Sequence, residues 1–475
     1  MNVINFTGDA WEARVGDGDP YEDALRIADA VGELAHELNP DARVYVGFDS
    51  RSLSRSLAPE MAEVVAGHGI TCYVSDACCP SCVLAEAVRL DSKAIGGIML
   101  TAGNKPADYF GIRVCMADGS PATSGDTDVL ESHVVPELPS ARGEAEPVDL
   151  MTRYLERTSG FIDGDAIAVQ APLVVCDPMY GSMCGHAARL LGSLGARVIE
   201  IHADDEEDFG GLHPDAAEPW IDECEQAVGD QGAAWGVAID GAGERIALID
   251  ERGRYVTPHK MLALIMGYLV RERGITGRMV VPIFVSSVVR RQAARLGLQL
   301  TVTPAGYMWM REEMLAGNVV CAGDALGGVG IPALGLERDA LAAAAVLADC
   351  IARDGRPLSV ISDALDEELG RMYYGRREVR MGAGAIQMLR NYLPGLNPAE
   401  MAGMKAVSVS HSAGSLRVEL EGDAWVLVRP SASSPTALVC AEAPTKTDRD
   451  ALLDAGAALA LEPLELGKEQ SPRSK

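Results

Sequence analysis

The chain has 475 residues, more than a single hydrophobic core usually serves, and this length predicts three or four domains. Its 41 Lys and Arg against 69 Asp and Glu give a formal net charge of −28, which disfavours nucleic acid and anionic membrane surfaces as partners. No stretch resembles a secretion signal or reaches the roughly 18 apolar residues of a membrane span. We therefore expect the eleven cysteines to be reduced thiols of a cytoplasmic protein.

The first 145 residues alternate between helical and strand patterns. Residues 6–14 are expected to form an irregular loop at the start. Helices are predicted at 21–38, 57–68 and 83–90, and buried strands at 44–46, 70–74 and 98–100. This alternation is typical of βαβ units around a mainly parallel sheet, so we predict a first α/β domain over residues 1–145.

Two further α/β units follow, predicted over residues 146–255 and 256–369. In the first of them, strands are expected at 173–175, 198–201 and 235–239, and a helix at 185–194. In the second, strands are expected at 279–285 and 300–302, and helices at 288–296 and 338–353.

The last unit, predicted over residues 370–466, has a different pattern. Apolar residues alternate at period two between residues 407 and 428, which predicts antiparallel strands. A helix is expected at 446–461, and residues 467–475 are expected to be a disordered tail. The unit is therefore predicted to be a smaller α+β domain.

Four polar loops stand out, one in each unit, at residues 101–106, 240–245, 323–328 and 429–435. Three of them directly follow a predicted buried strand. Loops at strand ends are where α/β proteins commonly hold binding and catalytic groups. The first loop carries a hydroxyl, an amide and an ammonium group (Thr101, Asn104, Lys105), with Gly103 between them.

Seven stretches, in this order along the chain, resemble the α-D-phosphohexomutases, the family of phosphoglucomutase, phosphomannomutase and phosphoglucosamine mutase. They are FTGDAWEARV at 6–15, VGFDSR at 46–51, GGIMLTAGNKPADYFGIRV at 96–114, DFGGLHP at 208–214, VAIDGAGER at 237–245, LERDALAAA at 336–344 and DAWVLVRPS at 423–431. The resemblance covers nearly the whole chain. It implies three α/β domains with mixed sheets and a C-terminal α+β domain, arranged around a central cleft.

The resemblance also implies a chemistry. A phosphoserine in the first loop exchanges its phosphoryl group with a hexose phosphate through a hexose bisphosphate, which makes the family intramolecular phosphotransferases, or isomerases. Mg²⁺, held by three aspartates of the second loop, neutralises the moving charge. The third loop contacts the sugar hydroxyls, and the fourth holds the phosphate that does not react.

This sequence departs from that pattern in the first loop. The nucleophilic serine of the family corresponds to Gly103, which has no atom that can carry a phosphoryl group. Asn104 and Lys105 stand where the family has histidine and asparagine. Thr101 could replace the serine only if the loop were rebuilt, so we expect no intact catalytic set.

The metal loop departs as well. Asp240 keeps the first ligand, but Ala242 replaces the second and Glu244 lengthens the third. Because Mg²⁺ requires near-octahedral oxygen ligands at short distances, we expect it to bind weakly or not at all. Charge also changes nearby, since Glu12 and Met308 stand where the family has an arginine and a lysine.

Several residues could still hold a sugar phosphate. The resemblance assigns this role to Arg245, Gly323, Asp324, Arg429, Ser431 and Ser433, with Arg51 as a further phosphate contact.

Three functional hypotheses remain open. The first is a pseudoenzyme of hexose phosphate metabolism that binds a hexose phosphate, a hexose bisphosphate or a protein partner. The second is an active phosphosugar enzyme with altered chemistry, in which water is the nucleophile. The third is a structural or regulatory partner protein without a sugar ligand. Whether the chain is an enzyme is therefore left open at this level.

Overall fold

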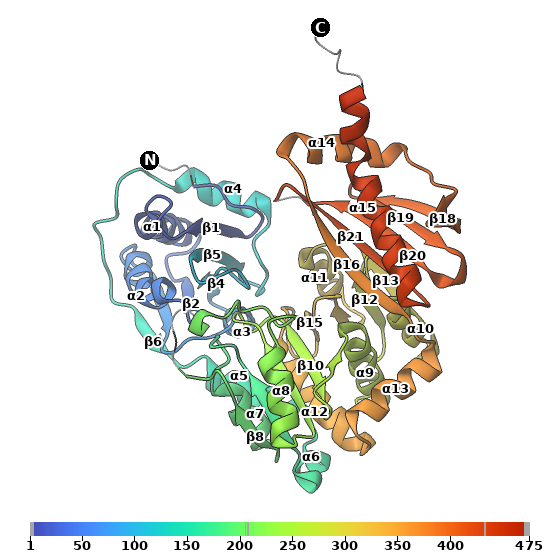
Figure 1. The fold of residues 1–475 in the computed structure, drawn as a ribbon. Coiled ribbons are helices and arrows are strands. Elements are labelled where there is room, and N and C mark those ends of the chain that lie inside the picture. Colours follow the sequence, from blue (N-terminus) through green and yellow to red (C-terminus); the bar gives the residue numbers. More distant parts are fainter. Residues whose placement is uncertain (1–3, 205, 207–208, 432–433, 470–475) are drawn as a thin grey trace. The chain divides into compact units, whose positions relative to one another are not determined.

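The protein is described from a computed structural model, which covers residues 4–204, 206, 209–431 and 434–469 (Figure 1). The chain forms two compact units. The first comprises Met1–Val280 and Met310–Ser362, and the second comprises Val281–Trp309 and Asp363–Lys475. Within the described part of the chain, no helix is both long enough and apolar enough to cross a bilayer.

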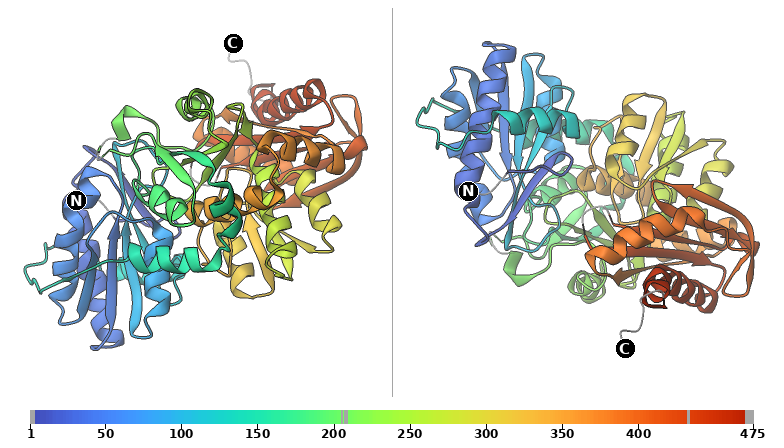
Figure 2. Two further views of the ribbon diagram at one scale, coloured as in Figure 1. Left: turned by 90° about the horizontal axis from the view of Figure 1, so that it is seen from below. Right: turned by 90° about the horizontal axis from the view of Figure 1, so that it is seen from above.

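The first unit begins with a mixed six-stranded sheet of order β1-β5-β4-β2-β3-β6. Strand β2 is parallel to β3 and β4, whereas β5 is antiparallel to β4 and β1. Alternate residues of β2 point to opposite faces: Val44 and Val46 pack in the core with α1 and α2, and Gly47 approaches Leu84 of α3. Helices therefore cover both faces of this sheet, as Figures 1 and 2 show. The elements are β1 (Ala10–Arg14), α1 (Pro20–Leu38), β2 (Arg43–Phe48), α2 (Ser52–Ala66), β3 (Thr71–Ser75), α3 (Ser81–Leu90), β4 (Ala94–Leu100), β5 (Tyr109–Met116), α4 (Ser124–His133) and β6 (Glu146–Val148).

One prediction for this region is wrong. Residues 6–14 were expected to be an irregular loop, but Ala10–Arg14 form β1 at the edge of the sheet. The strand pairs antiparallel with β5, for example Trp11 with Ile112. A short strand whose partner lies about a hundred residues away leaves little local signal, because its stabilising contacts are not local.

The first unit continues with a five-stranded sheet of order β11-β10-β9-β7-β8. A four-stranded sheet of order β13-β12-β14-β15 is divided between the two units, because β13 belongs to the second. The boundary between the two units passes through β12. The alanine-rich helix α12 is buried along nearly its whole length, because its small side chains allow close packing against α9, α6 and α7. Of the elements in this part of the chain, α10 and β13 belong to the second unit, and β12, α11 and α13 cross the boundary between the units. In chain order the elements are α5 (Met151–Phe161), α6 (Asp165–Gln170), β7 (Leu173–Asp177), α7 (His186–Ser193), β8 (Arg197–Glu200), η1 (Phe209–Gly211), α8 (Asp222–Gln231), β9 (Trp235–Ile239), β10 (Ile246–Asp250), β11 (Tyr255–Val256), α9 (Pro258–Arg271), β12 (Arg278–Pro282), α10 (Ser287–Arg295), β13 (Gln299–Thr303), α11 (Tyr307–Leu315), β14 (Val319–Gly323), β15 (Val329–Gly330), α12 (Ala340–Asp354) and α13 (Leu358–Leu369).

The second unit is built on an antiparallel six-stranded sheet of order β16-β21-β20-β19-β18-β17. Helices α14 and α15 pack on one face of it, and α15 (red in Figure 1) runs along β16, β20 and β21. Helix α15 extends to Glu469, so the first residues of the expected disordered tail are helical, and residues 470–475 lie outside the described residues. The elements are β16 (Tyr373–Arg380), α14 (Ala383–Tyr392), η2 (Leu393–Gly395), β17 (Glu400–Met401), β18 (Met404–Ser412), β19 (Ser415–Leu420), η3 (Glu421–Asp423), β20 (Trp425–Pro430), β21 (Thr436–Ala443) and α15 (Lys446–Glu469).

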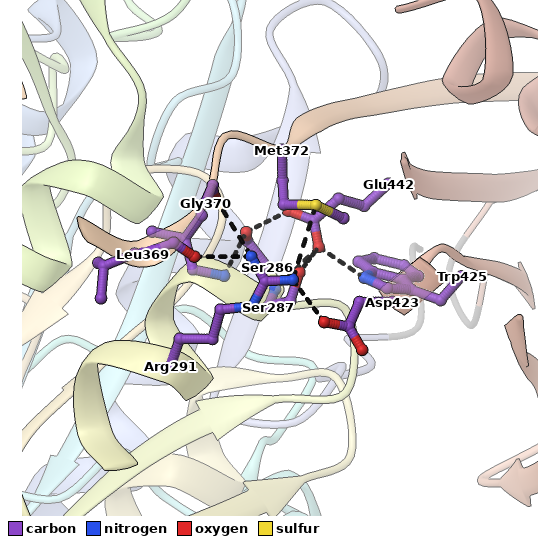
Figure 3. Close-up of polar contacts among 10 residues, drawn as sticks. Ser286, Ser287, Arg291, Leu369, Gly370, Met372, Asp423, Trp425 and Glu442 are labelled. Atoms are coloured by element: carbon purple, nitrogen blue, oxygen red, sulfur yellow. Dashed lines mark hydrogen bonds and ion pairs between the residues drawn. The ribbon is translucent and has the colours of Figure 1, made fainter. Parts of the chain in front are cut away.

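A buried carboxylate joins the two chain segments of the second unit (Figure 3). Glu442 of β21 is fully buried and accepts hydrogen bonds from the hydroxyls of Ser286 and Ser287. It also accepts from the backbone N–H of Ser287 at 2.8 Å and from the indole N–H of Trp425 at 2.9 Å. Nearby, Arg291 donates to the carbonyl of Leu369 at 2.7 Å. These bonds hold the start of α10 against the C-terminal sheet.

Candidate functional site

The first polar loop connects β4 to β5 and turns sharply at Gly103. This residue is buried and has φ +60°, a left-handed conformation that glycine adopts without strain. Its N–H donates to Oγ1 of Thr101 at 3.1 Å, so the Thr101 hydroxyl serves as an acceptor inside the turn. Asn104 and Lys105 are half-buried.

Arg51 holds this loop from inside. Its guanidinium donates to the carbonyls of residues 103, 105, 106 and 109 at 2.6–3.0 Å, and its Nε donates to Asp49 at 3.1 Å. All five N–H groups of a guanidinium are thereby engaged. The structure thus places Arg51 as the support of the loop backbone, and its proposed contact with a phosphate stays a prediction.

Arg113 of β5 lies against Gly103. A Cβ atom built on Gly103 would stand 3.1 Å from Nη2 of Arg113, which is closer than side chains normally approach. The space that a side chain at position 103 would enter is therefore bordered by a guanidinium.

Two charged residues that stood out in the sequence form a pair. Lys105 of the first loop bonds Glu12 of β1, and its ammonium lies 5.1 Å from the centre of the Tyr109 ring. The charge reversal at position 12 is therefore balanced by the lysine of the loop.

The second polar loop is the hairpin between β9 and β10. Oδ1 of Asp240 accepts the backbone N–H groups of Glu244 at 2.7 Å and Arg245 at 3.0 Å, which closes the turn. Asp240 and Ala242 are both buried. Burial raises the pKa of Asp240, and the charge of the neighbouring Glu244 adds to the rise.

Glu244 is held between two arginines. Its Oε1 bonds Nη1 of Arg113, and its Oε2 bonds Nη2 of Arg338. Glu244 is buried. Burial by itself would raise the pKa of Glu244, but the two guanidinium groups outweigh burial and hold it well below its usual range. The carboxylate is therefore ionised and occupied by cations of the chain itself.

The second and third loops are joined through their backbones. Arg245 and Gly328 form an isolated antiparallel bridge, and the N–H of Ile246 donates to the carbonyl of Gly327 at 3.1 Å. In the third loop, Oδ1 of Asp324 accepts from the N–H groups of Leu326 at 2.8 Å and Gly328 at 3.1 Å.

The side chains of these two loops also interact through charge. Arg245 pairs with Asp215 at 3.2 Å. Burial opposes the charge of Arg245, but Asp240 and Asp324 favour it, and its pKa is raised overall. Gly323, the last residue of β14, packs against the side chain of Leu262, which would have to move to admit a side chain at position 323. The structure therefore brings together Asp240, Glu244, Arg245 and Asp324.

The fourth loop belongs to the second unit and begins with the last two residues of β20. Arg429 is half-buried, and burial lowers its pKa. Oγ of Ser431 accepts from the N–H and the hydroxyl of Ser434 at 3.1 and 2.8 Å, which closes a tight turn. Ser433, which the sequence predicted as a phosphate contact, lies outside the described residues.

The metal loop does not provide a ligand set for Mg²⁺. Asp240 uses one carboxylate oxygen for two backbone N–H groups, Ala242 has no donor atom, and both oxygens of Glu244 are bonded to arginines. Among the described residues, the group of three acidic side chains whose oxygens lie within 4.8 Å of one another is elsewhere, on and before α8 (Glu218, Asp222, Glu225). The loop therefore fails the ligand requirement of a hard divalent cation.

Sequence reasoning missed Arg113 and Arg338. Both stand inside stretches that carried the family resemblance, but nothing local in the sequence shows that they converge on Glu244. Arg113 and Glu244 are 131 residues apart. The sequence feature that could have indicated their role is that each of the two arginines follows a polar loop.

Comparisons with known proteins agree with this architecture. Family models described as phosphoglucomutase/phosphomannomutase, alpha/beta/alpha domains I, II and III, match residues 4–137, 152–253 and 257–368. A phosphoglucomutase/phosphomannomutase of Thermococcus kodakarensis is 27% identical over 449 residues, which is 93% of this chain and 95% of the relative. A phosphoglucosamine mutase of Rhodospirillum rubrum is 28% identical over 434 residues, or 88% of this chain and 89% of the relative.

A solved structure is similar as well. A crystal structure assigned to a phosphomannomutase from Thermus thermophilus superposes with a TM-score of 0.84 at 26% identity, covering 96% of this chain and 99% of that one.

The fold and the comparisons define a mixed α/β protein with three phosphohexomutase-type segments and a C-terminal domain, as the sequence predicted. The chain belongs to the phosphoglucomutase/phosphomannomutase family, the α-D-phosphohexomutases, whose function lies in sugar phosphate metabolism.

Proposed function

We propose that this protein is a non-catalytic member of the family, which binds a hexose phosphate but does not move its phosphoryl group. The observation that carries the proposal is the pair Gly103 and Arg113. Position 103 has no hydroxyl, and a guanidinium borders the space where one would stand. A phosphoryl transfer through an enzyme intermediate requires a nucleophilic side chain at that place.

Ligand binding is supported by the groups that remain. Arg245 and Asp324 lie in adjoining loops of the first unit, and Arg429 and Ser431 lie in the fourth loop. Guanidinium groups, hydroxyls and carboxylates of this kind suit the phosphate and hydroxyl groups of a hexose phosphate. A cytoplasmic location is part of this proposal and rests on the interpretation of the cysteines as reduced thiols.

The test combines two measurements on the full chain. The first is intact mass after incubation with a hexose 1,6-bisphosphate and Mg²⁺, alongside a mutase assay on glucose, mannose and glucosamine 1-phosphates. We expect no phosphoryl adduct and no turnover, whereas an active mutase of the family, run as a positive control, gives both. An adduct together with turnover would show an active enzyme and defeat the proposal.

The second measurement is thermal unfolding with and without the corresponding hexose 6-phosphates. A ligand that binds the native state must raise its melting temperature. We expect at least one hexose phosphate to do so. If none of them shifts the melting temperature, the ligand part of the proposal is wrong, and a structural or regulatory partner role is favoured instead.

A further inference from the structure

The two arginines on Glu244 occupy the part of the second loop that the family resemblance assigns to a divalent metal. Each carboxylate oxygen of Glu244 bonds a different guanidinium, from Arg113 of β5 and from Arg338 just before α12. The three side chains are largely buried: the exposed fractions are 23% for Arg113, 16% for Arg338 and 8% for Glu244.

The two arginines place positive charge next to Glu244, where the family resemblance implies a divalent cation. Two guanidinium groups carry the same formal charge as one Mg²⁺. A divalent cation placed at Glu244 would have to displace both of them or lie beside two fixed positive charges in a poorly hydrated place. In Asp240, the remaining loop carboxylate, one oxygen already accepts two backbone N–H groups of its own turn.

Arg113 is also placed to meet a ligand. Its Nη1 bonds Glu244, while its Nη2 faces the space beside Gly103, 3.1 Å from the position of an added Cβ. With Gly103 in place of a larger residue, that space lacks a side chain of its own. A guanidinium with one edge held by a carboxylate can offer its other edge to a phosphate oxygen.

We propose that Arg113 and Arg338 replace the divalent metal as the fixed cations of this site, so that the protein binds a phosphate monoester without metal. The nature of the ligand, a hexose phosphate, rests on the proposed function. The exclusion of the metal rests on the contacts of Glu244 alone, and the two parts are tested separately.

The metal part is tested with Mn²⁺ alone, followed by electron paramagnetic resonance of the free ion. All samples carry Glu225→Gln, because the exposed acidic group at α8 could hold Mn²⁺ independently. The parent protein, which carries Glu225→Gln alone, is expected to leave Mn²⁺ free. The same is expected when Ala242→Asp is added, which restores the missing carboxylate of the metal loop. Ala242→Asp combined with Arg113→Met and Arg338→Met is expected to bind Mn²⁺ at least about tenfold more tightly, because Glu244 is then released.

Two outcomes overturn this part. One is Mn²⁺ binding to the parent or to Ala242→Asp alone that disappears when Asp240→Asn is added, because the arginines would then not exclude the ion. The other is a folded combined variant that gains no Mn²⁺ affinity.

The ligand part is tested by calorimetry of the unaltered protein with whichever hexose 6-phosphate raises its melting temperature, in EDTA and in Mg²⁺. We expect the same Kd within about twofold in both conditions, and a loss of about tenfold in Arg113→Met, since one charge-assisted hydrogen bond is worth about that factor. The control is Arg43→Met, which removes an arginine of the same sheet that pairs with Asp91 at 3.0 Å. Affinity that falls in EDTA overturns the proposal whether or not the variants fold. Absence of all hexose phosphate binding defeats the proposed function and the ligand part, while the Mn²⁺ result still decides the metal part.

Discussion

Two buried glutamates of this protein have their carboxylates compensated by different kinds of partner. Glu244, in the second loop, is neutralised by two guanidinium groups. Glu442, in the C-terminal sheet, is fully buried and satisfied by the hydroxyls of Ser286 and Ser287 together with a backbone and an indole N–H. A carboxylate whose four hydrogen bonds come from neutral donors suits a structural joint, because such bonds require a fixed local geometry. A carboxylate between two partly exposed cations suits a binding site, because each guanidinium can also meet the charge of a ligand.

The largest effect is expected for Glu442→Ala. The substitution leaves four donors without an acceptor in a closed core, so the free energy of unfolding should fall by about 3–5 kcal/mol. Urea unfolding measures the loss, and hydrogen exchange of β20 and β21 shows where it acts. Glu400→Ala, at an exposed position of the edge strand β17, is the control and should be nearly neutral. A similarly small loss in Glu442→Ala would contradict its role as a joint.

Glu244→Gln is expected to have a smaller effect, about 2–3 kcal/mol, because Arg113 and Arg338 are partly exposed and water relieves part of their repulsion. The loss should shrink in high salt, because salt screens the charges of the partly exposed arginines, whereas the loss in Glu442→Ala should depend little on salt, because that site is fully buried. Glu86→Gln is the matched control, since Glu86 is equally buried but pairs with one arginine, Arg157, at 2.6 Å. Equal losses of stability in the two variants would argue against a stabilising contribution from the second arginine on Glu244.

Gly103→Ser tests whether a hydroxyl alone restores the chemistry. We expect a loss of about 1 kcal/mol from the left-handed backbone, together with contact against Arg113 and no phosphoryl adduct by intact mass. Gly69→Ser separates strain from contact, because Gly69 also has a positive φ but has open space around it. An adduct on Gly103→Ser would show that the rest of the mutase site is functional.

The smallest effect concerns a third kind of acidic site, a cluster of three carboxylates on and before α8. Burial, with the charges of Glu218 and Asp222, raises the pKa of Glu225 to about 7. The folded state therefore keeps a proton that the unfolded chain releases, and the stability this provides is lost as pH rises through about 7. Glu225→Gln should raise the melting temperature more at about pH 8 than at about pH 5. A gain that does not depend on pH would exclude charge crowding as its cause.

The sequence predicted the family, the alternation of elements and the loop that contains Gly103. These features depend on local patterns: apolar runs, turn residues and ordered motifs. It did not predict β1 or the partners of Glu244, because both depend on contacts between distant segments. The departures at Glu12, a charge reversal, and at Glu244, a longer carboxylate, were visible as isolated differences. In the structure each has a partner of opposite sign, Lys105 for Glu12 and the two arginines for Glu244.

The bridge between Arg245 and Gly328 has a consequence for dissecting the chain. A truncation between the second and third family segments would leave both the second and the third polar loop intact. It would, however, place the two sides of the Arg245–Gly328 bridge in different fragments. The N–H of Ile246 in one fragment and the carbonyl of Gly327 in the other would then both lose their hydrogen-bond partner. Such edges recruit other strands, so fragments ending near residue 255 should self-associate, whereas a piece that retains both hairpins keeps this edge covered.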